Sequence, residues 1–235
     1  MGEKVTANGF GELKEDYLSP FDTGELQIKK TIYTKYVKRC FDIVLSSIAI
    51  VVTLPINIVI GVVTLCSLGR PVFFSHKRPG LAEKPFTIVK FRNMTNDTDE
   101  SGELLPPDQR TTKLGSFLRK TSLDELLQFY LIFIGKMSII GPRPLLMSYL
   151  PEYSLEQHKR HSVKPGLECP MPFYGHEGLD WDERIRNDVW YTENISLKTD
   201  IIMMIRLFKL VFNSDRSKNR SEKIDSTFKN NNSEI

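Results

Sequence analysis

The chain has 235 residues, 40% of them hydrophobic and 26% charged, and its formal net charge is +3. This length allows one domain with short extensions, and so small a net charge does not indicate nucleic-acid binding. The three cysteines, Cys40, Cys66 and Cys169, form no CxxC pair, so neither a disulfide framework nor a zinc knuckle is indicated and a reducing cytosol is expected.

A long apolar segment follows a polar N-terminal extension, residues 1–35, which we expect to be weakly ordered. Residues 43–68 include no charged side chain. A bilayer core of about 30 Å needs roughly 20 apolar residues to cross it, so this segment belongs at a membrane. Pro55 at its centre lacks a backbone N–H and clashes with the preceding turn, so we expect the helix to break or kink there. The apolar run lies too far from the N-terminus for a cleavable signal peptide.

Basic residues flank the apolar segment on both sides. Upstream, residues 29–39 have no acid and carry Lys29, Lys30, Lys35, Lys38 and Arg39. Downstream, residues 69–92 have a single acid and carry Arg70, Lys77, Arg78, Lys84, Lys90 and Arg92. Because basic residues favour the cytoplasmic side, a segment that dips into one leaflet and returns satisfies both flanks, whereas a straight span satisfies one. The residues alone leave both topologies open, since Asn57 in a kinked spanning helix could face a partner helix.

Two short strands are expected after the membrane segment, at residues 71–76 and 85–92, and the turn-rich sequence between them predicts a hairpin. Residues 93–113 are polar and predict a loop. Further along, the pattern predicts a helix over about 114–135, a rigid turn at IIGPRP, a helix over 145–163 and a Pro/Gly-rich loop over 164–180.

The C-terminal part begins with a segment of helical spacing, residues 197–212, in which Lys198, Arg206 and Lys209 share one side. A basic stripe on an apolar helix suits a helix that lies in the membrane interface, and a core helix with a solvated face is the alternative. The tail, residues 213–235, is rich in Asn, Ser and Lys, so we expect it to be disordered.

The candidate chemical centre is TSLDEL at residues 121–126. Ser-x-x-Glu ahead of an apolar run is typical of a capping box, and alone the pattern favours this structural role for Ser122 and Glu125. A carboxylate in the first turn of a helix is also stabilised as an anion by the helix dipole, which makes Asp124 a candidate nucleophile or metal ligand. Helix starts also bind phosphates, and Arg119 lies just upstream to add positive charge.

Other segments carry groups suited to phosphate or metal. In GPRP at residues 141–144, two prolines fix the backbone around Arg143, as bidentate recognition of phosphate oxygens requires; a simple turn is the alternative. Lys90 and Arg92 share one face of a predicted strand, with a solvated edge as the alternative. The sequence DTD at residues 97–99 resembles the DxD metal clamp of nucleotide-sugar glycosyltransferases, but such short matches are frequent in polar loops.

Several segments match one protein family in their order along the chain. They are KRCFDIVLS (38–46), RPG (78–80), KFRNM (90–94), GELLP (102–106), LRKTSLDELLQ (118–128), GKMSIIGPRPLL (135–146), RHSVKPG (160–166) and DVWYTENISLKTDI (188–201). With the proline-containing membrane segment, they resemble the monotopic phosphoglycosyl transferases, the bacterial sugar transferases of the PglC type. The resemblance covers residues 36–212, and its ordered motifs make it specific.

The resemblance implies that a sugar 1-phosphate passes from a UDP-sugar to a polyprenyl phosphate, with release of UMP. Asp124 matches the family's nucleophile, which forms a phosphosugar–enzyme intermediate, and Glu125 would assist it. Mg²⁺ would be the cofactor, held by both carboxylates and the diphosphate. This agrees with the chemistry, because an anionic nucleophile that attacks an anionic substrate needs cations to stabilise the transferring phosphoryl group. The implied substrate-binding residues are Lys90, Arg119, Pro142, Arg143 and Pro144.

The resemblance also implies a location. The membrane segment, residues 36–69, would be a re-entrant helix-break-helix with its break at Pro55. The catalytic domain, residues 70–212, would lie with its interfacial helices on the cytoplasmic face of a bacterial inner membrane. The lipid phosphate is found at that interface.

Three departures from the family pattern are visible. The membrane break usually reads Ser-Pro, whereas this chain has Leu54-Pro55, where Thr53 could supply the hydroxyl; Leu127 also replaces a proline after the dyad. The third departure is the largest, because the family's GITGWAQVNGR reads GLECPMPFYGH here, at residues 166–176. The residues that change this loop most are Cys169, Pro170, Pro172 and His176. A different sugar or a loss of activity would follow if the loop holds the nucleotide-sugar.

We therefore expect an α+β, predominantly helical, monotopic membrane protein with a small β-hairpin. The expected partners are a UDP-sugar, a polyprenyl phosphate and membrane lipid, with no nucleic acid; association with itself or with other glycan-assembly enzymes is left open. Two alternatives remain: an inactive scaffold of a glycan-assembly complex, and a DxD glycosyltransferase that depends on Asp97 and not on Asp124.

Overall fold

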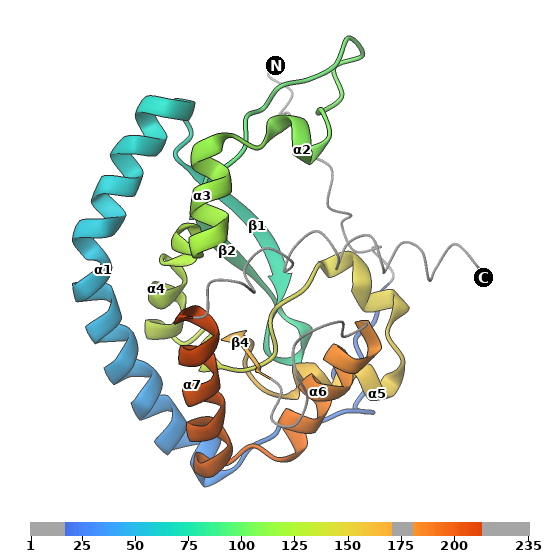
Figure 1. Cartoon of the computed structure of the whole chain (residues 1–235). Coiled ribbons are helices and arrows are strands. Elements are labelled where there is room, and N and C mark those ends of the chain that lie inside the picture. The colour runs from blue at the N-terminus through green and yellow to red at the C-terminus, as the bar shows by residue number, and fades with distance from the viewer. Residues whose placement is uncertain (1–16, 171–180, 213–235) are drawn as a thin grey trace.

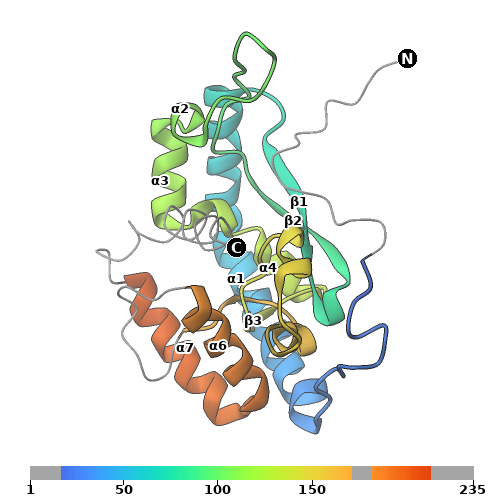
Figure 2. The ribbon, with the colours of Figure 1, turned by 90° about the vertical axis from the view of Figure 1, so that its right-hand side faces the viewer.

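The computed structural model describes residues 17–170 and 181–212. The expectations for residues 1–16, for the loop positions Pro172 and His176, and for the tail 213–235 lie outside the described residues. A long helix, α1 (Lys38–Leu68), runs along one side of the molecule, and the hairpin of β1 (Phe73–Pro79) and β2 (Pro85–Phe91) crosses the middle of the view in Figure 1. In Figure 2 the hairpin lies toward the right and α1 lies behind. The described chain is predominantly helical with one small antiparallel sheet, as expected.

Helix α1 spans Lys38–Leu68 and follows one π-helical turn, Tyr33–Val37. It continues through Pro55, so the expected helix-break-helix is not found. Proline removes only one backbone donor, and the apolar helix persists on both sides of it. The Thr53 hydroxyl donates to Ala49 O at 2.7 Å, whereas the carbonyl deprived of its donor belongs to Val51. Thr53 therefore reinforces the preceding turn and does not replace the bond lost at Pro55.

The two faces of α1 differ sharply. The inner face carries its buried residues at helical spacing: Lys38, Asp42, Ser46, Ile60 and Thr64. The outer face exposes large apolar side chains, among them Ile43, Val44, Ile48, Val51, Val52, Leu54, Ile58, Val59, Val62 and Val63. Within the described ranges, this is the one helix long and apolar enough to cross a membrane. An exposed apolar face of this extent marks a membrane or partner surface.

The predicted hairpin is confirmed. Strands β1 (Phe73–Pro79) and β2 (Pro85–Phe91) pair antiparallel, with Phe74 opposite Lys90. On the face of β2 that carries Lys90, Phe86 and Ile88 are buried against α4 (Gln128–Phe133). Because β2 is packed in this way, the end of the strand lies beside the segment that precedes α4.

The prediction of one continuous helix over 114–135 is wrong, because a helix, a 3-10 turn and a second helix share this range. Helix α2 (Pro107–Arg110) precedes α3 (Lys113–Thr121), and Ser122 ends α3 in the left-handed conformation, with φ of 56°. A 3-10 turn, Leu123–Glu125, then leads into α4. A residue in the left-handed conformation ends a helix, so residues 121–126 form a turn between two helices.

A second small sheet was not predicted. Strand β3 (Ser138–Ile140) pairs in parallel with β4 (Gly166–Glu168). Directly after β3 the backbones come very close, because a Cβ at Gly166 would lie 2.2 Å from Gly141 N. Only glycine fits this crossing, which fixes the start of the GPRP segment.

The predicted helix over 145–163 is also wrong. A 3-10 segment, Met147–Glu152, is followed by the single turn α5 (Leu155–His158) and by another 3-10 turn, Lys159–Ser162. Pro151 removes a backbone donor, and Ser154 caps a new helix start, so no continuous helix forms.

Two helices complete the described chain, α6 (Trp181–Glu193) and α7 (Leu197–Phe212), and the second agrees with the prediction. Met203 of α7 is buried in the core, while the opposite side exposes Ile201, Ile202, Ile205, Phe208, Lys198 and Lys209. A helix with one face in the core and an exposed face that is both apolar and basic is compatible with the membrane interface.

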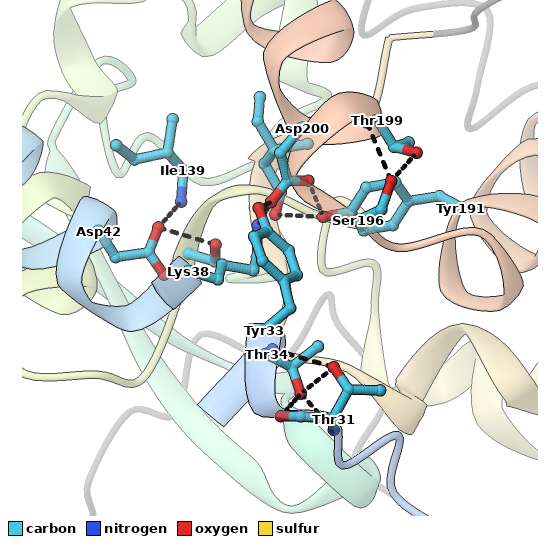
Figure 3. Close-up of polar contacts among 12 residues, drawn as sticks. Thr31, Tyr33, Thr34, Lys38, Asp42, Ile139, Tyr191, Ser196, Thr199 and Asp200 are labelled. Carbon is cyan, nitrogen blue, oxygen red and sulfur yellow. Dashed lines mark hydrogen bonds and ion pairs between the residues drawn. The ribbon is translucent and has the colours of Figure 1, made fainter. Parts of the chain in front are cut away.

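A buried polar cluster joins the start of α1 to α6, α7 and β3 (Figure 3). Asp200 in the first turn of α7 accepts hydrogen bonds from Tyr33 at 2.5 Å, Lys38 at 2.7 Å and Tyr191 at 2.6 Å. Nearby, Asp42 accepts from the Ser138 hydroxyl at 2.9 Å and from Ile139 N at 3.0 Å. The start of α1 is thereby tied to α7 and to β3.

Candidate functional site

The site is centred on the 3-10 turn Leu123–Glu125, which faces the end of β2. Asp124 is only 4% exposed, and the Glu125 side chain is 16% exposed. Ser122 makes no side-chain capping bond, so the predicted capping box is absent. Glu125 is consequently free to bond with side chains from elsewhere in the fold.

Glu125 joins two of the predicted cations. Its Oε1 accepts from Lys90 Nζ at 2.5 Å and from Arg143 Nη2 at 2.5 Å. Burial disfavours the carboxylate, but Arg143 and Lys90 outweigh burial and lower the pKa of Glu125. This side chain is a fixed anion that gathers a lysine from β2 and the arginine of GPRP.

Asp124 has different surroundings. Its Oδ2 accepts from Asn93 Nδ2 at 3.0 Å, while its buried Oδ1 has no hydrogen-bond partner among the described residues. Burial and the charge of Glu125 raise the pKa of Asp124, whereas Lys90 and Arg119 act against them. A buried oxygen without a partner needs an explanation, and an absent ligand or reacting atom is one.

Arg119 occupies a different position from the other two cations. It is exposed in the last turn of α3. It acts on Asp124 through charge, lowering its pKa. Arg119 therefore lies at the rim of the site, where it could meet an incoming anion.

The GPRP segment is held from both sides. Pro142 and Pro144 are buried around Arg143, whose Nη1 donates to Leu167 O of β4 at 3.1 Å. From the opposite side, Arg160 donates to Arg143 O at 2.8 Å and is paired with Asp188 at 2.6 Å. The backbone of Arg143 is thus fixed by Arg160, and its guanidinium is oriented by the Leu167 carbonyl and by Glu125.

Strand β1 adds a pair of side chains to the face that carries Lys90. His76 Nε2 accepts from Arg78 Nε at 2.9 Å. Burial, together with Arg78 and Lys90, lowers the pKa of His76 to about 3. The ring is therefore neutral at physiological pH and serves as an acceptor that orients Arg78.

Arg92 does not share the role predicted from its spacing with Lys90. It lies just past the end of β2, and its guanidinium donates to the carbonyls of Leu68, of Gly69 at 3.1 Å and of Arg70 at 3.2 Å. These groups are at the C-terminal end of α1, where the helix dipole favours a cation. Arg92 therefore anchors α1.

The DTD segment is used within its own loop. Asp99 Oδ1 accepts from Ser101 N at 2.9 Å, from the Ser101 hydroxyl at 2.6 Å and from Glu103 N at 3.0 Å. Asp97 accepts from the Thr95 hydroxyl at 2.5 Å. These bonds are typical of turn-forming aspartates, and they favour the structural interpretation of the segment.

A magnesium ion would depend on the dyad and on its substrate. Across residues 17–170 and 181–212 there is no group of three or more His, Cys, Asp or Glu that could hold a metal. The Asp124 and Glu125 carboxylates, adjacent in sequence, both offer hard oxygen ligands. Mg²⁺ commonly takes one or two carboxylates, water and substrate phosphates, so the residues fit this ion.

Sequence reasoning missed Asn93 and Arg160, although both stood in matched motifs. Each acts through a contact distant in sequence, with Asp124 and with the backbone of Arg143 respectively. A local pattern cannot reveal such partners. The only available signal was the place of each residue in a motif that matches the family.

Comparison with known proteins identifies the family. The model of the family described as bacterial sugar transferase matches residues 33–214. A protein named uncharacterized sugar transferase EpsL, from Bacillus subtilis, is 40% identical over 178 residues, which cover 76% of this chain and 88% of the relative.

Other relatives carry names that state a reaction. The UDP-glucose:undecaprenyl-phosphate glucose-1-phosphate transferase of Klebsiella pneumoniae is 37% identical over 73% of this chain and 39% of its own length. The undecaprenyl-phosphate galactose phosphotransferase of Salmonella typhimurium is 32% identical over 77% of this chain and 42% of its own length. The chain thus spans most of EpsL but about two fifths of these larger relatives.

Proposed function

This chain belongs to the bacterial sugar transferase family, and we propose that it transfers a sugar 1-phosphate from a UDP-sugar to a polyprenyl phosphate. The names of the relatives from Klebsiella and Salmonella support this reaction type. The product would be a polyprenyl diphosphosugar, the starting lipid for assembly of a glycan. UMP would be the second product.

The observation that carries the proposal is the contrast between two adjacent carboxylates. Glu125 is neutralised by Lys90 and Arg143, whereas Asp124 has one buried oxygen without a partner in the described chain. An unpartnered carboxylate oxygen beside cations that suit phosphate is what a phosphoryl-transfer nucleophile requires.

The reaction has two steps. In the first, Asp124 Oδ1 attacks the phosphorus that bears the sugar, and the bond from this phosphorus to the bridging oxygen breaks. UMP leaves with that oxygen and its electron pair, and the sugar phosphate remains on Asp124 as an acyl phosphate. In the second, an oxygen of the polyprenyl phosphate attacks the same phosphorus, and Asp124 leaves as a carboxylate.

The side chains around the dyad would stabilise this transfer. Arg143 and Lys90 would bind diphosphate oxygens while they remain next to Glu125, and exposed Arg119 would attract the incoming anion. Asp124 and Glu125 would hold Mg²⁺, which would supply Lewis-acid stabilisation of the phosphoryl oxygens.

We further propose that α1 enters one leaflet without crossing the bilayer. The same domain holds both of its ends, because Arg39 donates to Ile132 O at 2.7 Å near the start and Arg92 binds carbonyls at the end. Between them, Ile60 packs with Phe91 and Leu118. A helix held along its length by one domain keeps that domain on one side, and the basic flanks make this the cytoplasmic side of a bacterial inner membrane.

The names of the relatives include three sugars: glucose, galactose and N-acetylgalactosamine. In this chain Cys169 and Pro170, in the first part of the divergent loop, are buried, and Asn187 donates to the Cys169 carbonyl at 2.9 Å. We propose that this altered loop gives the chain a sugar preference different from that of the family's GITGWAQVNGR sequence.

The test is UMP release by the purified protein in detergent with undecaprenyl phosphate, Mg²⁺ and a panel of UDP-sugars. We expect sustained release with at least one sugar, dependent on lipid and metal, only a single-turnover burst when lipid is left out, and no release from Asp124→Asn. Asp97→Ala should retain activity, which separates this reaction from that of a DxD enzyme. Silence of the folded protein across the panel would favour the scaffold alternative and direct attention to residues 166–176.

A further inference from the structure

The hydrogen bond from Asn93 to Asp124 makes the two oxygens of the carboxylate different. Asn93 Nδ2 lies 3.0 Å from Oδ2, and Oδ1 has no partner in the part of the chain that the structure describes. A carboxylate without such a bond can rotate and exchange its oxygens. With the bond, one oxygen is held and the other keeps a fixed direction.

Asn93 is itself held firmly. It follows Arg92, which is buried against the carbonyls at the end of α1. Helix α3 also presses on its backbone, because a Cβ at Gly115 would lie 1.8 Å from Asn93 O. The backbone of Asn93 is thus confined both by α3 and by the neighbouring anchor of Arg92, which fixes the point from which its amide reaches Asp124.

We infer that Asn93 is a positioning residue that holds Oδ2 of Asp124 and thereby presents Oδ1 as the single attacking oxygen. This inference rests on the proposed function, because it assigns a direction to the attack of Asp124. Asn93 is not a catalytic residue in this account: it contacts the nucleophile and not the substrate. Its loss should therefore slow the chemical step and leave binding of the UDP-sugar nearly unchanged.

The experiment compares variants in the first half-reaction, where UDP-sugar and Mg²⁺ are mixed with the enzyme without lipid and the UMP burst is followed. Asn93→Leu keeps the shape and removes the donor, and Asn93→Ala is a second variant in case leucine disturbs folding. Asn93→Gln keeps an amide donor. Asn96→Leu is the matched control, since Asn96 is an exposed asparagine in the same loop.

We expect the burst rate of Asn93→Leu and Asn93→Ala to fall by about 10- to 100-fold, the usual cost of misplacing a reacting group. The UDP-sugar concentration that gives a half-maximal burst rate should change by less than about 3-fold, and Asn93→Gln should recover part of the rate. Asn96→Leu should behave like the wild type.

Two results would overturn the inference while leaving the proposed function intact. One is a wild-type burst rate in both donor-free variants. The other is a loss of rate that comes entirely from weaker binding of the UDP-sugar, which would make Asn93 a substrate ligand. Absence of any UMP release from the wild-type protein would overturn both the inference and the proposed function.

Discussion

At the scale of the residue, Asp124 and Glu125 show how neighbours in sequence acquire opposite properties. Glu125 shares one oxygen between Lys90 and Arg143, and its pKa is lowered despite burial. For Asp124, burial outweighs the nearby cations and raises the pKa. When the surroundings shift the pKa values of two carboxylates in opposite directions, the two groups commonly have different roles. Here Glu125 is the anion that holds the two cations, and Asp124 is the carboxylate that can react.

The raised pKa of Asp124 predicts a pH dependence. Attack requires the ionised carboxylate, so kcat/KM should fall on the acid side at a pH above 3.8, the ordinary pKa of an aspartate. Arg119 lowers the pKa of Asp124, and its removal must raise it. Arg119→Gln should therefore move the acid limb to higher pH, and more so at low salt. A pH profile of UMP release tests this, and a limb that stays in place or moves to lower pH contradicts it.

Removal of Glu125 should cost stability as well as activity. Glu125→Ala leaves Lys90 and Arg143 without their shared anion. Because these two side chains are 22% and 35% exposed, we expect a cost of about 1–3 kcal/mol, below that of breaking a fully buried pair. Urea unfolding in detergent measures the free energy of unfolding.

Glu156→Ala is the control for that measurement, because its ion pair with Lys159 is exposed. Loss of a surface pair should change the free energy of unfolding by less than about 1 kcal/mol. Equal effects of the two substitutions would show that the Glu125 cluster is not a buried network.

At the scale of the element, the active turn depends on how α3 ends. Ser122 in the left-handed conformation stops α3, and the next three residues form the 3-10 turn that faces β2. Close approach of α3 to the end of β2 is permitted by Gly115. The position of the dyad therefore depends on one helix end and one glycine contact.

Gly115→Ala tests that contact. The added Cβ would lie 1.8 Å from Asn93 O, so α3 or the strand end must move. Overpacking of this kind costs about 1–3 kcal/mol and should lower the rate of UMP release by displacing Asn93 from Asp124. Ser116→Ala, one position along the same helix, is the control. Wild-type activity and melting temperature in Gly115→Ala would contradict the contact.

Much of the architecture could be predicted from local pattern. The hairpin and α7 follow from strand-forming runs around a turn and from helical spacing. The helices predicted over 114–135 and 145–163 were wrong, because a left-handed serine and Pro151 interrupt them. Local sequence does not determine which residue adopts the left-handed conformation when it is not glycine.

The residues of the candidate site could likewise be predicted only in part. Lys90, Glu125 and Arg143 were chosen for their chemistry, and the structure brings them together. Asn93 and the anchoring role of Arg92 were not predicted, because each depends on a contact with a segment distant in sequence. Motifs indicate which residues matter, whereas tertiary packing decides what each one touches.

At the scale of the whole molecule, the proposed topology makes α1 the connection between the membrane surface and the candidate site. Its outer face is apolar, and its inner face and both ends contact the domain that carries the dyad. Burial of so much exposed apolar area in lipid would hold the site at the interface, where a polyprenyl phosphate presents its charged end. Catalysis at this interface needs no movement of the lipid phosphate away from the membrane.

Native cysteines provide a test of this topology. Cys40 and Cys66 are exposed near the two ends of α1, whereas Cys169 is buried. A membrane-impermeant maleimide applied to the outside of intact cells should label neither Cys40 nor Cys66, because the proposed topology places both ends of α1 on the cytoplasmic side. Cys66→Ser and Cys40→Ser variants assign any signal. Labelling of Cys66 from outside would show that α1 crosses the bilayer.

The covalent intermediate is the central claim, and intact-protein mass spectrometry tests it most directly. The protein is mixed with its UDP-sugar and Mg²⁺ without lipid and is quenched rapidly. We expect a mass increase of one sugar phosphate, mapped to Asp124, removed by polyprenyl phosphate and absent from Asp124→Asn. UMP release that occurs only with lipid and without an adduct, or an adduct on another residue, would contradict it.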